Sequence, residues 1–302
     1  VICAAGTPRV RGEPGFTTAT SDPATAAFAV MLNTRQVIVT TVSANTLPTP
    51  PVTGRPFNGS SITNRTPIFD WFNSSDADGD VISYHLQVDD NARFNNPEIN
   101  VSAITDLSTA APENTTWYST IELAVDTTYY WRVRANDSTG FGTWSNGAAN
   151  DGPGDASNLS NFTVNSLLSI TMMNNAVEFG EVAPGTEVNT SDQVPAPFRA
   201  ENTGNIDANV SLNASAIFIT IPINRSAYQF KIRANESNAF SSVLSATGWT
   251  NVTNSTTAAH VVNLTWRDSR NDFLTDINLT IPSDEPSGFK TSTITFTVVR
   301  NE

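Results

Sequence analysis

Apolar and polar residues alternate over short stretches along most of the chain, between breaks rich in Gly, Pro, Asn and Asp. Residues 82–89 and 127–135 show this period of two, and so do residues 228–233 and 291–299. These stretches are rich in β-branched and aromatic side chains, which fit a pleated, half-buried strand. The pattern therefore predicts an all-β fold made of short strands joined by turns.

Breaks in the pattern divide the chain into three parts. Residues 1–47 form a coil-rich arm, residues 48–166 a first β-sandwich and residues 167–302 a second one. A Pro-rich run at residues 47–51 separates the arm from the first sandwich, and such runs form extended, semi-rigid spacers. We therefore expect two sandwiches preceded by an extended N-terminal strand arm.

The arm contains one apolar strand pattern, at residues 24–44. It predicts either one long strand or two strands with a kink at residues 33–36. The alternating apolar positions are Phe28, Val30, Leu32, Val37 and Val39. A strand of about 20 residues spans roughly 60 Å, and it needs a partner because it lies outside a domain. It either pairs with another copy of the chain, which would link subunits into a fibre, or folds back on its own neighbouring domain.

The first sandwich carries motifs of a known family. Residues 123–135 contain Tyr129 and Trp131 in a pattern that resembles the E–F corner and F strand of a fibronectin type III domain. In that family the tyrosine matching Tyr129 forms a tyrosine corner, in which its hydroxyl bonds backbone upstream. Trp71 matches the family's buried tryptophan, and residues 142–145 resemble its Gly-x-Trp-Ser segment. A long insertion at residues 146–155 departs from the pattern.

The second sandwich resembles the immunoglobulin-like domains of archaeal and bacterial envelope proteins. This likeness is carried by the strand expected at residues 176–182, which ends in a Pro-Gly turn at residues 184–185, and by the hairpin turn at residues 200–205. In the first sandwich, the Asp-Ala-Asp-Gly-Asp loop at residues 76–80 and the strand that follows it resemble a loop and strand found in archaeal and bacterial surface proteins. The resemblance implies two immunoglobulin-like β-sandwiches in an archaeal cell-surface protein.

Composition and charge exclude several classes of function and structure. The 302 residues carry a formal net charge of −13, so the chain lacks the basic surface that binds nucleic acid. Cys3 is the single cysteine, which excludes an internal disulfide. No run of 18 apolar residues predicts a membrane span, and residues 1–6 look like the region after a removed signal peptide.

The excess of Asn-x-Ser/Thr sequons is the strongest compositional feature. There are seventeen, none before residue 58, and they indicate an extracellular protein that carries N-linked glycans. The alternative is an Asn- and Thr-rich surface with incidental matches. A segment that is buried against a neighbour cannot carry glycans, so the sequon-free arm fits an assembly role. The sequon asparagines are Asn58, Asn64, Asn73, Asn100, Asn114, Asn136, Asn158, Asn161, Asn189, Asn209, Asn213, Asn224, Asn235, Asn251, Asn254, Asn263 and Asn278.

One cluster has metal-binding character. Asp76, Asp78 and Asp80 alternate, so their carboxylates could converge on calcium, which prefers oxygen ligands. The alternative is a loop whose aspartates cap their own backbone turns. No other cofactor is expected. His85 and His260 lie on separate strand patterns, and no catalytic motif is present, so we do not expect an enzyme.

These observations predict a structural subunit of an extracellular, cell-surface, N-glycosylated filament. The subunit would form a homopolymer by adding its N-terminal strand to a neighbouring sheet. No strand is obviously missing from either sandwich, which favours addition to a complete sheet. The alternative is an S-layer or adhesin fragment that binds surface partners or carbohydrate.

Overall fold

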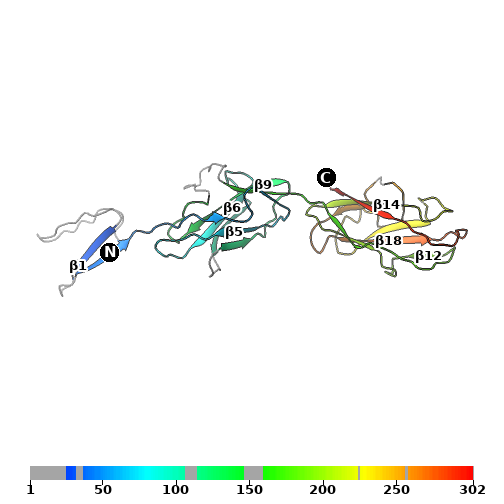
Figure 1. The fold of residues 1–302 in the computed structure, drawn as a ribbon, viewed down its shortest axis with the longest axis horizontal. Helices are drawn as coiled ribbons and strands as arrows, with labels where there is room; N and C mark the ends of the chain where they lie inside the picture. Colours follow the sequence, from blue (N-terminus) through cyan, green and yellow to red (C-terminus); the bar gives the residue numbers. More distant parts are fainter. Residues whose placement is uncertain are drawn as a thin grey trace.

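The computed structural model describes residues 25–31, 37–105, 114–145, 159–223, 225–255 and 258–301, with the backbone alone for 25–31 and 37–43. Every regular element in these ranges is a β-strand, as the sequence predicted. They form an N-terminal hairpin and two sandwiches that follow one another along the molecule (Figure 1). The predicted insertion at residues 146–155 lies outside the described residues.

The predicted arm strand is a hairpin. Strand β1 (Thr25–Met31) pairs antiparallel with β2 (Val37–Ser43), and Phe28 lies opposite Thr40 in the register. The expectation of one long donor strand over residues 24–44 is therefore wrong. The kinked alternative holds, because the two halves exchange backbone hydrogen bonds with each other. Leu32 lies outside the described residues.

The first sandwich packs a five-stranded sheet, in the order β4-β10-β9-β6-β7, on a three-stranded sheet, in the order β3-β5-β8. Trp71, Trp131 and Phe162 are fully buried between the sheets. The hydroxyl of Tyr129 accepts a hydrogen bond of 2.9 Å from the backbone N–H of Ala124, which confirms the tyrosine corner. The strands are β3 (Val52–Thr53), β4 (Ser60–Ile62), β5 (Ile68–Phe72), β6 (Ser83–Asp89), β7 (Ile99–Thr105), β8 (Asn114–Tyr118), β9 (Thr127–Asn136) and β10 (Ser160–Val164).

The second sandwich packs the sheet β11-β13-β18-β15-β16, with β12 also paired to β18, on the sheet β17-β14-β19. The strand predicted at residues 176–182 is irregular instead, and Gly180 has a φ of 70° that a strand does not accept. The strands are β11 (Ile170–Asn174), β12 (Glu187–Asn189), β13 (Phe198–Asn202), β14 (Ala208–Ala214), β15 (Tyr228–Ala234), β16 (Thr250–Asn251), β17 (Val261–Leu264), β18 (Asp272–Thr280) and β19 (Ile294–Arg300).

The two sandwiches meet at a hydrogen-bonded junction. The Asn205 side chain donates to the carbonyl oxygens of Thr63, at 2.6 Å, and of Asn165, at 2.9 Å. Its Oδ1 accepts the N–H of Leu167 at 2.6 Å. Asn205 is buried, so one amide ties the second sandwich to both the first sandwich and the connecting segment.

Candidate functional site

The end of the first sandwich that receives the arm is formed by loops around residues 73–82 and 137–142, and we call it the N-terminal pole. Several hydrogen bonds hold the incoming chain there. Asn45 Nδ2 donates to Asp137 Oδ2 at 2.7 Å, the N–H of Thr46 donates to Asp78 Oδ2 at 2.6 Å, and the N–H of Thr49 donates to the Ser75 carbonyl at 2.9 Å. The predicted Pro-rich spacer is therefore a docked segment.

The predicted acidic loop is also at this pole, but its membership changes. Asp76 and Asp80 come together with Asp137, so that one carboxylate oxygen of each lies within 4.8 Å of the others. Asp78 is not a member of this group, and its carboxylate accepts the Thr46 N–H instead. No sequence signal pointed to Asp137, which lies on the loop after β9, far along the chain from the Asp-rich loop.

Both interpretations of the acidic loop find support in its hydrogen bonds. Asp76 Oδ1 accepts the N–H groups of Asp78, at 2.9 Å, and of Asp80, at 3.1 Å, as a turn-capping aspartate does. Asp76 Oδ2, in contrast, is buried and has no hydrogen-bond partner in the described chain. A buried carboxylate oxygen without a donor is costly, and a cation beside it would remove that cost.

Asp137 contributes a fixed negative charge to this cluster. The hydrogen bond from Asn45 holds the pKa of Asp137 well below its usual range, with help from Thr139 and Gly140, although burial acts in the opposite direction. The side chain is 1% exposed. Three carboxylates that offer hard oxygen ligands suit calcium better than zinc or copper.

A second acidic group was not predicted. Asp89, Asp90 and Glu98 gather beside the loop between β6 and β7. Burial raises the pKa of Glu98, and the nearby carboxylates of Asp90 and Asp89 raise it further. Asp89 accepts the N–H groups of Asn91 and Asn96, so its oxygens already serve the loop backbone.

Most described sequon asparagines are accessible. Asn278 is the exception, because it is 3% exposed and its Nδ2 donates to Glu187 at 2.9 Å. The prediction that Asn278 carries a glycan is therefore wrong for the folded chain, which leaves no room for one there. Asn158 and Asn224 lie outside the described residues. The exposed sequon asparagines are Asn58, Asn64, Asn100, Asn114, Asn235, Asn254 and Asn263, and the partly exposed ones are Asn73, Asn136, Asn161, Asn189, Asn209, Asn213 and Asn251.

The two histidines have structural partners. His85 contacts Asn100 and Arg134 through its two ring nitrogens. His260 accepts the N–H of Leu212 at 2.9 Å and packs edge-on against Phe230, and burial lowers its pKa. Both rings therefore serve the strands that carry them.

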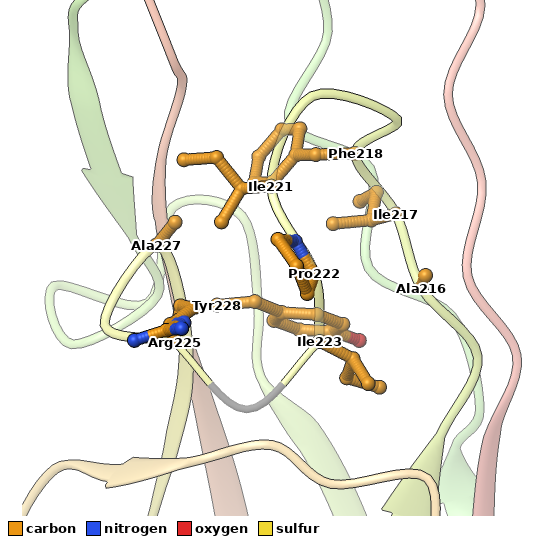
Figure 2. Close-up of a pocket in the computed structure, with 9 residues that line it drawn as sticks. All are labelled: Ala216, Ile217, Phe218, Ile221, Pro222, Ile223, Arg225, Ala227 and Tyr228. Carbon is orange, nitrogen blue, oxygen red and sulfur yellow. The ribbon is translucent and has the colours of Figure 1, made fainter.

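A small apolar hollow lies at the end of the second sandwich away from the junction. Figure 2 shows its mainly apolar lining, which includes Phe218, Ile221 and Tyr228. It has room for about one water molecule, which is less than a sugar ring needs. In the part of the chain that the structure describes, no helix is long and apolar enough to cross a membrane.

The sheet orders, the paired sandwiches and the tyrosine corner define a tandem immunoglobulin-like or fibronectin type III-like protein, a class whose domains are typically non-catalytic. Residues 53–150, within the first sandwich, match the family model of the Rha78A-like N-terminal immunoglobulin domain. No curated protein matched the sequence.

Solved structures similar to the chain include the following two. The chicken CNTN1 FN1–FN3 domains are 14% identical, with 84% of this chain and 67% of that one covered and a TM-score of 0.27. An alpha-L-rhamnosidase from Dictyoglumus thermophilum is 11% identical, with 85% of this chain covered and a TM-score of 0.24. The chain spans 30% of the length of that enzyme.

Proposed function

We propose that this chain is a structural subunit of an extracellular, N-glycosylated filament at an archaeal cell surface. The N-terminal hairpin of one subunit would bind a neighbouring subunit and so form a homopolymer. The observation that carries this proposal is the isolation of the hairpin. Strands β1 and β2 form a sheet of their own, which no described strand of either sandwich joins.

The physical argument is that such a hairpin needs a partner. A single two-stranded hairpin is marginally stable in water at best. This one is apolar in sequence, at residues 25–31 and 37–43, and lies apart from both sandwiches (Figure 1). Its outer edges offer unpaired backbone groups, which are a template for pairing with another chain.

The sequons support the same arrangement. The accessible ones lie on the two sandwiches, while the arm and hairpin have none before Asn58. Glycans would therefore coat the bodies of the subunits and leave the hairpin free to bind.

We further propose that Asp76, Asp80 and Asp137 bind calcium, with the unpartnered Oδ2 of Asp76 as the favouring observation. Asp137 also holds Asn45. A calcium ion at this cluster would therefore stiffen the joint between the hairpin and the first sandwich. That stiffness would fix the direction in which each subunit presents its hairpin.

Electron microscopy and sedimentation of the secreted full-length chain test the filament. We expect the unaltered chain to form fibres, and a Phe28→Asp/Val30→Asp variant to stay monomeric because the charges oppose burial of the hairpin. The matched control is Val243→Asp, which alters a valine that is 92% exposed on the second sandwich and should leave fibres intact. An unaltered chain that remains monomeric would contradict the proposal and favour the adhesin or S-layer alternative.

A further inference from the structure

The core of the second sandwich is less completely buried on the side of β19 than elsewhere along β14 and β15. Inward residues of β14 and β15 are buried, whereas Ile294, Phe296 and Val298 of β19 are only partly buried. The centroid of the Phe296 ring lies 6.1 Å from that of Phe198 on the opposite sheet, so the two sheets meet at these two partly buried residues. We call this set the apolar seam; its members are Ile170, Met172, Phe179, Val188, Phe198, Ile294, Phe296 and Val298.

The first sandwich has no comparable row among its described residues. Its partly buried apolar side chains each lie on a different strand or loop, and they are Ile62, Ile82, Val101, Trp117 and Val125. The contrast shows that the seam is not a general property of these sandwiches. It results from the position of β19, which pairs with β14 on one side and with no described strand on the other.

The distribution of sequons over the edge strands points to the same side of the second sandwich. Edge strands β7, β8, β16 and β17 carry Asn100, Asn114, Asn251 and Asn263 respectively. Among the described sandwich edges, the strands of at least five residues without a sequon are β11, with five residues, and β19, with seven. These two strands carry five of the eight seam residues. Glycans would thus oppose pairing at the edges of β7 and β8, whereas the free edges of β11 and β19 carry no sequon of their own. The accessible Asn209 and Asn213 lie on the neighbouring β14, opposite Val299 and Thr295 of β19.

We propose that the apolar seam is the receptor for the N-terminal hairpin of a second copy, which adds a strand along the free edge of β19. This inference rests on the proposed filament function and names the surface that function requires. One hairpin strand would continue the ladder of β19, and its alternate apolar side chains would cover the seam. Strands β1, β2 and β19 are each seven residues long, so their ladders can match in full.

The occupant comes from another copy because the hairpin of the same chain is held elsewhere. Asn45 and Thr46 fasten the chain to the N-terminal pole of its own first sandwich. A seven-residue strand reaches about 23 Å from that point, and the first sandwich stands between the hairpin and the second sandwich (Figure 1). Each chain therefore presents its hairpin beyond the first sandwich and its seam along the second, so that joining hairpin to seam produces a head-to-tail fibre.

A mixing experiment tests the seam. The donor variant, Phe28→Asp/Val30→Asp, has an altered hairpin and an intact seam. The acceptor variant, Val298→Asp, has an altered seam and an intact hairpin. We expect each variant alone to be monomeric and an equimolar mixture to yield heterodimers and nothing longer, measured by sedimentation. The matched control is Val101→Asp, a partly buried valine on edge strand β7 of the first sandwich, which should still form fibres.

The outcomes separate the two proposals. Val298→Asp fibres equal to those of Val101→Asp would overturn the seam, while loss of fibres in the donor variant would still support the filament. If Val298→Asp does not fold, a photocrosslinking residue at position 299, which is 51% exposed on β19, replaces it. In fibres it should crosslink to residues 25–43 of another chain, whereas position 52 on β3, 61% exposed, should not. Absence of that crosslink from position 299 would also overturn the seam.

Discussion

At the scale of single residues, the unpartnered oxygen of Asp76 leads to a calcium prediction. Calcium at about 100 times its Kd would stabilise the fold by about 2.7 kcal/mol, enough to raise the melting temperature by several degrees. We expect calcium to raise the melting temperature of the unaltered chain and not that of Asp76→Asn or Asp80→Asn. Calorimetry with calcium, with magnesium and with chelator measures this.

The control for calcium binding is Asp284→Asn, which alters an exposed carboxylate outside both acidic groups. It should respond to calcium as the unaltered chain does. An equal calcium response in Asp76→Asn and the unaltered chain would assign the loop to turn capping alone.

Glu285 makes a prediction about pH. Burial alone would raise its pKa, but Lys290, the Thr220 hydroxyl and the N–H groups of Ile219 and Thr220 together lower it from 4.5 to about 2. A lowered carboxyl pKa stabilises the fold above its unfolded value, and this contribution is lost as pH falls through the folded value. We expect Glu285→Gln to flatten the fall in melting temperature between about pH 4.5 and 2, and exposed Glu178→Gln to leave it unchanged. If the melting temperature of Glu285→Gln falls with pH as steeply as that of the unaltered chain, the lowered pKa of Glu285 does not contribute to acid stability.

At the scale of elements, the docked segment of residues 44–49 depends on Gly142. A Cβ at this position would overlap the carbonyl oxygen of Pro48. We expect Gly142→Ala to displace the segment and weaken hydrogen bonds that each contribute about 1 kcal/mol, so proteolysis between the hairpin and the first sandwich should become roughly tenfold faster. Limited digestion followed by mass spectrometry would show this.

Gly248→Ala is the matched control, since no heavy atom lies within 4 Å of the place that a Cβ would occupy there. It should not change the digestion rate. Unchanged cleavage in Gly142→Ala would mean that the segment is held by contacts that do not depend on the close approach of Pro48.

Period-two patterns predicted most strands, because each sandwich strand places one side chain in the core and the next outside it. The tyrosine corner was predictable for a similar reason, as it is a local motif that spans Ala124 and Tyr129. The hairpin was not settled by pattern, because one long strand and two paired strands have the same alternation. The prediction of a strand at residues 176–182 was wrong because the spacing of apolar residues does not reveal the positive φ of Gly180.

The acidic site was predictable only in part. Asp76 and Asp80 share one loop, so their proximity follows from the sequence. Asp137 joins them because β9 pairs with β6 in a register that places Asn136 opposite Ser83. That long-range pairing is a property of the sheet, and no local pattern encodes it. The seam was missed for the same reason, since a strand count does not show which edges stay open.

At the scale of the whole molecule, two kinds of contact hold the sandwiches in line. Asn205 forms the buried hydrogen bonds of the junction. Around it, Arg267 pairs with Glu122, Arg300 pairs with Asp126 at 2.7 Å, and the Arg65 guanidinium lies 4.8 Å from the Trp266 ring. Surface ion pairs contribute about 0–1 kcal/mol and are screened by salt. Buried neutral hydrogen bonds are not screened, and each unsatisfied group costs about 1–3 kcal/mol.

The magnitudes therefore assign the stiffness of the junction to Asn205. We expect Asn205→Ala to broaden the distance distribution between spin labels at positions 90 and 243, in a Cys3→Ser background, where the unaltered junction gives a narrow one. Arg267→Ala should broaden it much less, and about 1 M salt should have little effect on the unaltered chain. A broad distribution at high salt would instead assign the stiffness to the ion pairs. In a filament built head to tail, that result would make the bending of the fibre depend on ionic strength.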